Sequence, residues 1–149
     1  MIRRVGFTAL LAIVLMSPAA LAQDAPKRTP SPPGAAVYFH YPLNGVRVPT
    51  TFKVLIGLRG MGVAPAGIQK PATGHHHLLI DAPVPPLNEP IPNDPQHVHL
   101  GGGQTEVEVT LPPGRHTLQL IVADQDHVPH DPPIVSQRIT VLVTGAEGQ

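Results

Sequence analysis

Residues 111–143 read "LPPGRHTLQLIVADQDHVPHDPPIVSQRITVLV", and this stretch decides the fold. Apolar side chains occupy every second position from Leu118 to Val122. The segment "VSQRITVLV", from Val135 to Val143, shows the same alternation. A period of two residues is typical of a β-strand with one buried face, and the "PPG" before the first segment is turn chemistry. The stretch therefore predicts two β-strands, one over 115–124 and one over 135–143.

Four other short segments alternate or form short apolar runs, and Pro-rich or Gly-rich stretches separate them. No part of the mature chain has the pattern of a helix. Six or seven short strands predict an all-β fold, an immunoglobulin-like antiparallel β-sandwich with long Pro/Gly-rich loops. The last third is also similar to the closing hairpin of many bacterial immunoglobulin-like domains, which says nothing about function. The four other segments are 36–42, 50–60, 75–82 and 104–111.

The N-terminus has the pattern of a secretory signal peptide. Arg3 and Arg4 precede an apolar run from Val5 to Met16, and Ala20-Leu21-Ala22 forms a small-residue cleavage site. We expect an exported, periplasmic protein with no membrane span after cleavage. The predicted organisation is a signal peptide over 1–22, a Pro-rich flexible leader over 23–35, one β-sandwich domain over 36–144 and a tail over 145–149.

Composition excludes several classes of function. The formal net charge is zero and no basic cluster stands out, so neither nucleic acid nor an anionic membrane is an expected partner. The chain has no cysteine, which removes disulfides, thiolate nucleophiles and thiolate metal ligands. Ser31 and Ser136 are the only serines after residue 22, which argues against a Ser-His-Asp hydrolase.

The nine histidines are the unusual feature of this small chain. In an extended strand alternate side chains share a face, so His75 and His77 of "TGHHHLLID" point the same way. His97 and His99 of "HVH" repeat this spacing, and His127 follows in the "ADQDHVPHD" loop. Long loops of 59–74 and 83–103 flank the triple histidine, and the second loop carries the other His pair. Long loops in small domains are often functional.

These five histidines are the predicted metal ligands, and the expected ion is copper or zinc, which imidazole suits. Other residues could support the site from behind the ligands: Asp126, Asp131, His130 and Met61. A protein of this kind would act as a carrier, buffer or sensor outside the cytoplasm. We expect His40 and His116 to be structural.

Two alternatives remain open. The protein could be a metal-dependent hydrolase with an open position for water. It could equally be a non-metal structural or interaction domain of the cell envelope, with an envelope protein as partner and histidines that brace its loops. The bracing alternative predicts that His76 and His77 contact backbone carbonyl oxygens. A histidine pH response is also compatible with the sequence, although no residue selects it.

Six sequence motifs, taken in their order along the chain, closely resemble the bacterial family catalogued as domain of unknown function 4399. The similarity covers roughly residues 36–143. It implies small exported bacterial proteins of one β-rich domain without an established activity, and it identifies no ligand. The six motifs are "GMGVAPAG", "TGHHHLLID", "HLGGGQTE", "LPPGRHTLQL", "DHVPHDPP" and "SQRITV".

Overall fold

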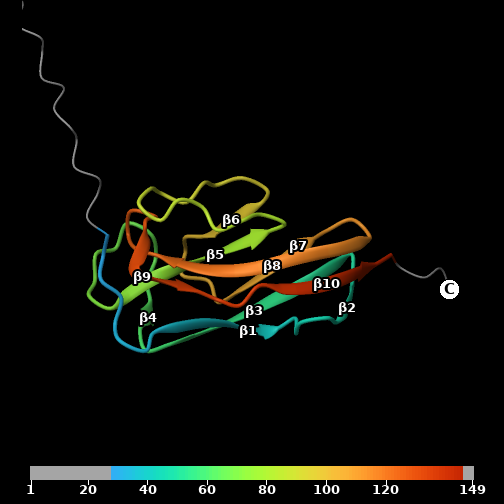
Figure 1. Ribbon diagram of the computed structural model, residues 1–149, viewed down its shortest axis with the longest axis horizontal. Coiled ribbons are helices and arrows are strands. Elements are labelled where there is room, and N and C mark those ends of the chain that lie inside the picture. Colours follow the sequence, from blue (N-terminus) through green and yellow to red (C-terminus); the bar gives the residue numbers. More distant parts are fainter. Residues whose placement is uncertain (1–27, 146–149) are drawn as a thin grey trace, which may run out of the picture.

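A computed structural model describes residues 28–145 as two β-sheets packed face to face (Figure 1). The predicted all-β sandwich is confirmed. The predicted signal peptide, the first part of the leader and the end of the tail lie outside the described residues. The smaller sheet has the strand order β1-β3-β7, formed by β1 (Ala36–Tyr41), β3 (Thr51–Arg59) and β7 (Glu106–Thr110).

The larger sheet has seven strands in the order β2-β10-β8-β5-β4, with β6 paired to β5 and β9 paired to β8. Most pairs are antiparallel, as predicted, but β2–β10 and β4–β5 are short parallel pairs. The bounds of these strands are β2 (Arg47–Pro49), β4 (Gly62–Val63), β5 (Thr73–Ile80), β6 (His97–Leu100), β8 (Gly114–Ala123), β9 (Pro129–Val135) and β10 (Ile139–Thr144).

The main core lies between the two sheets. Leu78, Leu120 and Val141 of the larger sheet are completely buried there, opposite Phe52 and Val54 of the smaller sheet. These residues recur at every second position, so each strand turns one face inward. Burial of branched aliphatic side chains supplies most of the stability of a domain that has no disulfide.

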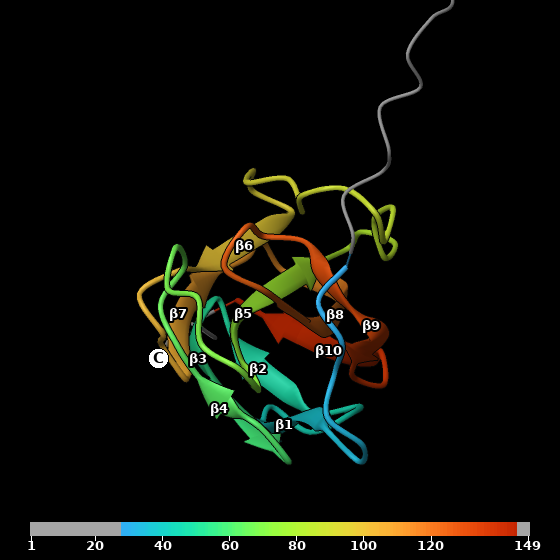
Figure 2. The same cartoon turned by 90° about the vertical axis from the view of Figure 1, so that its left-hand side faces the viewer.

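A second, smaller core lies on the opposite face of the larger sheet. Leu79, Ile121 and Ala123 are buried on this outer face against Ile91, which comes from the loop between β5 and β6. Figure 2 shows this loop beyond β5 and β6, on the side away from β1 and β4. Strand β5 is therefore covered on both faces, and every residue from Gly74 to Ile80 is buried.

The strand predicted over 135–143 begins later than predicted, because its first residue belongs to the end of another strand. Strand β9 ends at Val135, and β10 begins at Ile139. At the break, the backbone N–H of Ser136 donates to the carbonyl of Leu120, and the Ser136 hydroxyl accepts from the Leu120 N–H. These bonds attach the connection between β9 and β10 to β8. The edge of β8 that does not pair with β5 pairs with β10 along its first half and with β9 along its second half. The apolar alternation spans the break and conceals it.

The second half of the predicted leader is bonded to the domain. Ser31 donates its backbone N–H to the carbonyl of Asp131, and the Asp131 N–H donates to the carbonyl of Thr29. Residues 28–31 therefore lie alongside the start of β9. The part of the chain that the structure describes contains no helix long and apolar enough to cross a membrane.

Candidate metal centre

The triple histidine lies on β5, where alternation divides it between two faces. His76 shares the core side of the strand with Leu78, while His75 and His77 face outward with Leu79. All three side chains have no solvent exposure. The outer face is buried because the loops on either side of β5 cover it, so these imidazoles lie in an enclosed layer.

His99 joins this pair through the register of β6. It is the cross-strand partner of His77, so the two rings leave the sheet on the same face. One ligand nitrogen from each of His75, His77 and His99 lies within 4.8 Å of the others. The ring centroids are 4.9 Å apart for His75 and His77, and 5.0 Å for each of these rings to His99.

His127 approaches the three rings from the turn between β8 and β9. Its ring centroid lies 5.1 Å from that of His75, 4.8 Å from that of His99 and 6.2 Å from that of His77. Its backbone has a φ of 67°. The left-handed conformation is uncommon outside glycine, although histidine is among the residues that adopt it more often. Strained backbone of this type often accompanies a functional site.

Asp124 holds this turn in place. One oxygen of its carboxylate accepts the backbone N–H groups of Asp126 and Val128, at 3.0 and 3.1 Å. The other accepts the Thr29 hydroxyl at 2.6 Å. The carboxylate is buried, and both of its oxygens accept hydrogen bonds at this turn. It therefore holds the loop that carries His127 in one conformation.

Gly101 lets the His99 ring lie against the backbone. A Cβ atom at this position would be 2.1 Å from Cε1 of His99, closer than any real contact. The first glycine of "HLGGG" is therefore required for packing, because a larger residue at this position would displace the His99 ring from the cluster.

Several nitrogens of the cluster have no hydrogen-bond partner within the described residues. Nε2 of His75 lies 3.0 Å from Nε2 of His77, so one of these atoms donates to the other. Nδ1 of both residues and Nε2 of His99 are buried and unpaired. An unpaired buried polar atom costs about 1–3 kcal/mol, and native proteins contain few of them.

Burial keeps these imidazoles neutral. Desolvation, reinforced by the neighbouring imidazoles of His75 and His99, lowers the pKa of His77 to about 2. Desolvation, followed by the influence of His127 and His99, lowers the pKa of His75 to about 4. Desolvation and His127 lower the pKa of His99 as well. A neutral imidazole offers a lone pair, which is the form that binds a metal ion.

The comparisons with known proteins give a family for this chain. A family model described as "Domain of unknown function (DUF4399)" matches residues 54–144. The chain belongs to this family. The resemblance noted from the sequence is confirmed over that range, and all four clustered histidines lie within it.

The other comparisons add no function to this DUF4399 protein. No curated protein matches the chain. An endo-beta-1,4-mannanase from Thermotoga petrophila has a TM-score of 0.43 and 16% sequence identity, over 74% of this chain and 20% of the enzyme. The chain thus spans one fifth of that protein's length, and a likeness with this TM-score carries no argument.

The structure does not bring His97, the fifth predicted ligand, into the cluster. His97 lies across from Leu79, one step further along the outer face than His99. Its Nδ1 lies 2.9 and 3.0 Å from the two carboxylate oxygens of Asp94, which also accepts the His97 backbone N–H. The i, i+2 spacing predicts a shared direction for His97 and His99, but the carboxylate engages the His97 ring.

The predicted supporting residues also have other contacts. Asp126 accepts from the side chain of Gln125, and Asp131 forms an ion pair with Arg28. His130 is buried beside Gly74, with Nδ1 3.5 Å from the carbonyl oxygen of Val122. Met61 packs against the main core. Asp124, in the same loop as Asp126 and Asp131, is the carboxylate that organises the His127 turn, and the sequence does not single it out.

The remaining histidines are engaged outside the cluster. Nδ1 of His76 lies 3.0 Å from the carbonyl oxygen of Gln104. His116 lies 2.6 Å from the Asp81 carboxylate and 2.9 Å from the carbonyl oxygen of Pro112, as befits the structural role predicted for it. His40 is exposed and stacks edge-on against Tyr38.

Proposed function

We propose that this protein binds one transition metal ion, copper or zinc, through His75, His77 and His99. His127 is the fourth imidazole within reach. The observation that carries the proposal is the convergence of one ligand nitrogen from each of three histidines within 4.8 Å, two of these residues being completely buried. The same three rings carry buried nitrogens without a hydrogen-bond partner, and a bound ion would satisfy one nitrogen of each ring that it contacts.

The chemistry of the ligands favours copper or zinc. Imidazole suits Zn(II) and Cu(II), and the stability order of divalent ions is highest at copper. Calcium and magnesium prefer oxygen ligands. Among residues 28–145, no carboxylate joins the three imidazoles in this group. An all-nitrogen site is therefore a poor one for those two ions.

We further propose that the protein is a carrier, buffer or sensor of the ion outside the cytoplasm. The extracytoplasmic location rests on the signal-peptide pattern of residues 1–22. A site of three imidazoles with a fourth within reach suits retention of an ion better than turnover. The hydrolase alternative has less support, because it needs an acid or base beside a vacant position.

The bracing alternative also has less support. It expects His76 and His77 to contact backbone carbonyl oxygens. His76 does so, but the partner of His77 is the imidazole of His75. An imidazole pair with two unpaired nitrogens is a weak brace, since it leaves polar atoms buried without compensation.

Calorimetric titration of the mature chain, residues 23–149, with zinc chloride and with copper sulfate tests the proposal. We expect one ion per chain, with nitrogen ligands visible in the electron paramagnetic resonance spectrum of the Cu(II) form. The variant His75→Ala/His77→Ala should lose this binding. The matched control is His40→Ala, which removes an exposed imidazole and should leave the titration unchanged. Equal affinity of the double variant and the parent protein would reject the proposal.

A further inference from the structure

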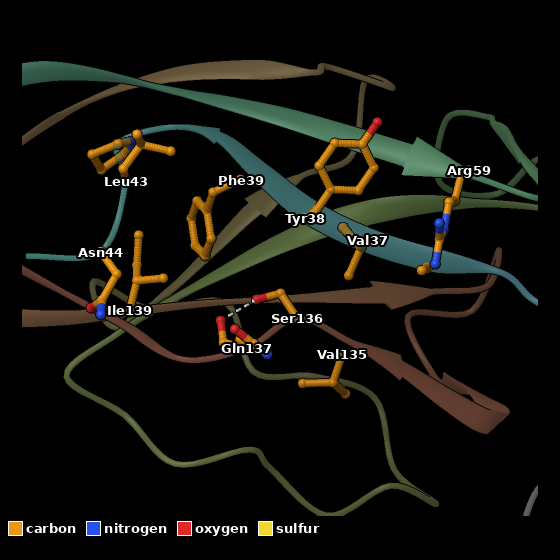
Figure 3. Close-up of a pocket in the computed structure, with 12 residues that line it drawn as sticks. Val37, Tyr38, Phe39, Leu43, Asn44, Arg59, Val135, Ser136, Gln137 and Ile139 are labelled. Carbon is orange, nitrogen blue, oxygen red and sulfur yellow. Dashed lines mark hydrogen bonds between the residues drawn. The ribbon is translucent and has the colours of Figure 1, made fainter.

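A cavity of about 750 Å³ opens at one side of the sandwich (Figure 3). It lies between β1, the outer strand of the smaller sheet, and the connection from β9 to β10 of the larger sheet. Figure 3 shows Val37 and Phe39 directed from β1 toward Ser136 and Gln137. Arg59 lies at one end of the cavity and Leu43 at the other.

The cavity has the composition of a binding site for a small molecule. Its volume falls within the range of about 300–1,000 Å³ that is typical of ligand pockets. Val37, Phe39 and Ile139 provide an apolar lining. Leu43 contributes a further apolar side chain, 60% exposed, which a ligand in the cavity would cover.

One charge marks the cavity. Arg59 is its only charged lining residue, and no Asp or Glu lines it. Within residues 28–145, no hydrogen bond or ion pair engages the guanidinium of Arg59. The side-chain amide of Gln137 is equally free there. A guanidinium with unused donors is suited to a carboxylate, which it can bind through two parallel hydrogen bonds.

The edge of β1 is poorly suited to an added peptide strand. Its pairing with β3 shifts register between Phe39 and Tyr41. A bulge of this kind bends the strand and interrupts the row of backbone groups that a further strand would need. A small ligand that lies in the cavity fits these observations better than a peptide.

We propose that this cavity binds an amphipathic carboxylate, a molecule with one carboxylate group and an unbranched apolar chain. Arg59 pairs with the carboxylate, and the apolar chain lies along Phe39 and Ile139 toward Leu43. The site contains no histidine and shares no residue with the metal cluster, so it does not rest on the proposed metal binding.

The test is a titration of the ¹⁵N-labelled mature chain with sodium decanoate, kept below its micelle concentration and followed by NMR. Decanol and acetate serve as ligands that lack the charge and the chain, respectively. We expect decanoate to shift the amide signals of Val37, Phe39, Ser136 and Ile139 and to bind more tightly than either of the other ligands.

Arg59→Gln should weaken decanoate binding about five- to tenfold, the range for one exposed charge-assisted contact, and should leave decanol unchanged. Leu43→Ser should weaken the binding of both decanoate and decanol. Because Leu43 is exposed, this substitution should not affect folding. The matched control is Arg47→Gln, an exposed arginine on β2 that does not line the cavity. Three results would each overturn the proposal: no shifts at millimolar decanoate, shifts confined to other faces, or unchanged affinity in Arg59→Gln.

Discussion

Replacing two buried imidazoles with leucine should remove metal binding without weakening the metal-free fold. The variant is His75→Leu/His77→Leu. Both side chains have no solvent exposure, and they lie on the face of the larger sheet that also buries Leu79 and Ile121. Leucine is close to histidine in volume and matches these apolar neighbours, so the change introduces little overpacking.

The magnitude follows from the hydrogen bonds that the two residues make. Each contributes one buried, unpaired Nδ1, and removing such an atom recovers about 1–3 kcal/mol. Their shared Nε2 contact at 3.0 Å is lost, at a cost of about 1 kcal/mol, but both partners disappear together and no new unpaired atom remains. We expect a net gain in the free energy of unfolding of about 1–5 kcal/mol.

Chemical denaturation in the presence of a chelator measures this change. A gain of 1 kcal/mol corresponds to an increase of about 4–8 °C in the melting temperature of a 60–100-residue domain, and somewhat less in a larger one. In the parent protein, zinc at a hundred times its dissociation constant should add about 2.7 kcal/mol, and in the double variant it should add nothing.

The neighbouring His76 supplies the matched control. It is equally buried and lies on the same strand, but it faces the core and contacts the carbonyl oxygen of Gln104. His76→Leu should therefore leave the zinc-dependent stabilisation intact. If the double variant lost more than about 1 kcal/mol without metal and still responded to zinc, the reasoning from unpaired nitrogens would be refuted.

Three further predictions concern the same site. Because the pKa values of the two outward-facing imidazoles of β5 fall from 6.5 to about 4 and about 2 on folding, the metal-free protein should keep its full stability above about pH 6.5. It should lose up to about 1.4 kcal/mol per pH unit for each of these imidazoles as the pH falls toward 4, measured by denaturation across that range. Gly101→Ala should weaken zinc affinity at least about tenfold in calorimetry, because a Cβ atom would displace the His99 ring. Thr29→Val removes the hydroxyl that Asp124 accepts at 2.6 Å, so it should cost about 1 kcal/mol and weaken zinc binding through the loop of His127.

Each of these has a control or a contrary result. The acid loss of stability should be much smaller in the double leucine variant, and an equal loss there would assign it to other groups. Gly62→Ala, where a Cβ atom would make an ordinary contact at 3.4 Å, should leave zinc affinity unchanged. If Thr29→Val lowers stability with no change in zinc affinity, His127 does not contribute to the site.

Alternation in the sequence predicted most of the fold, because a two-residue period is a local property. It located the strands that became β1, β3, β5, β7, β8 and β10. It did not reveal β9, whose sequence "PHDPPIV" is rich in proline and lacks alternation. Proline is tolerated there because Pro132 and Pro133 lie where the pairing of β9 with β8 shifts register, so neither needs to donate a ladder N–H.

The convergence of the histidines depends on register, which the sequence does not display. The i, i+2 spacing correctly placed His75 and His77 on one face, but the same rule grouped His97 with His99. The register of β5 and β6 sets His99 beside His77 and moves His97 toward Leu79, where Asp94 engages it. Asp94 lies only three residues from His97, and this local pairing was the available signal.

A crystal of the mature protein grown with zinc or copper tests the central claim most directly. An anomalous difference map should show one ion at about 2.0–2.1 Å from a nitrogen of each of His75, His77 and His99, the usual zinc–imidazole distance. An ion bound at His97 and Asp94 instead, or a map with no peak among His75, His77 and His99, would contradict the account.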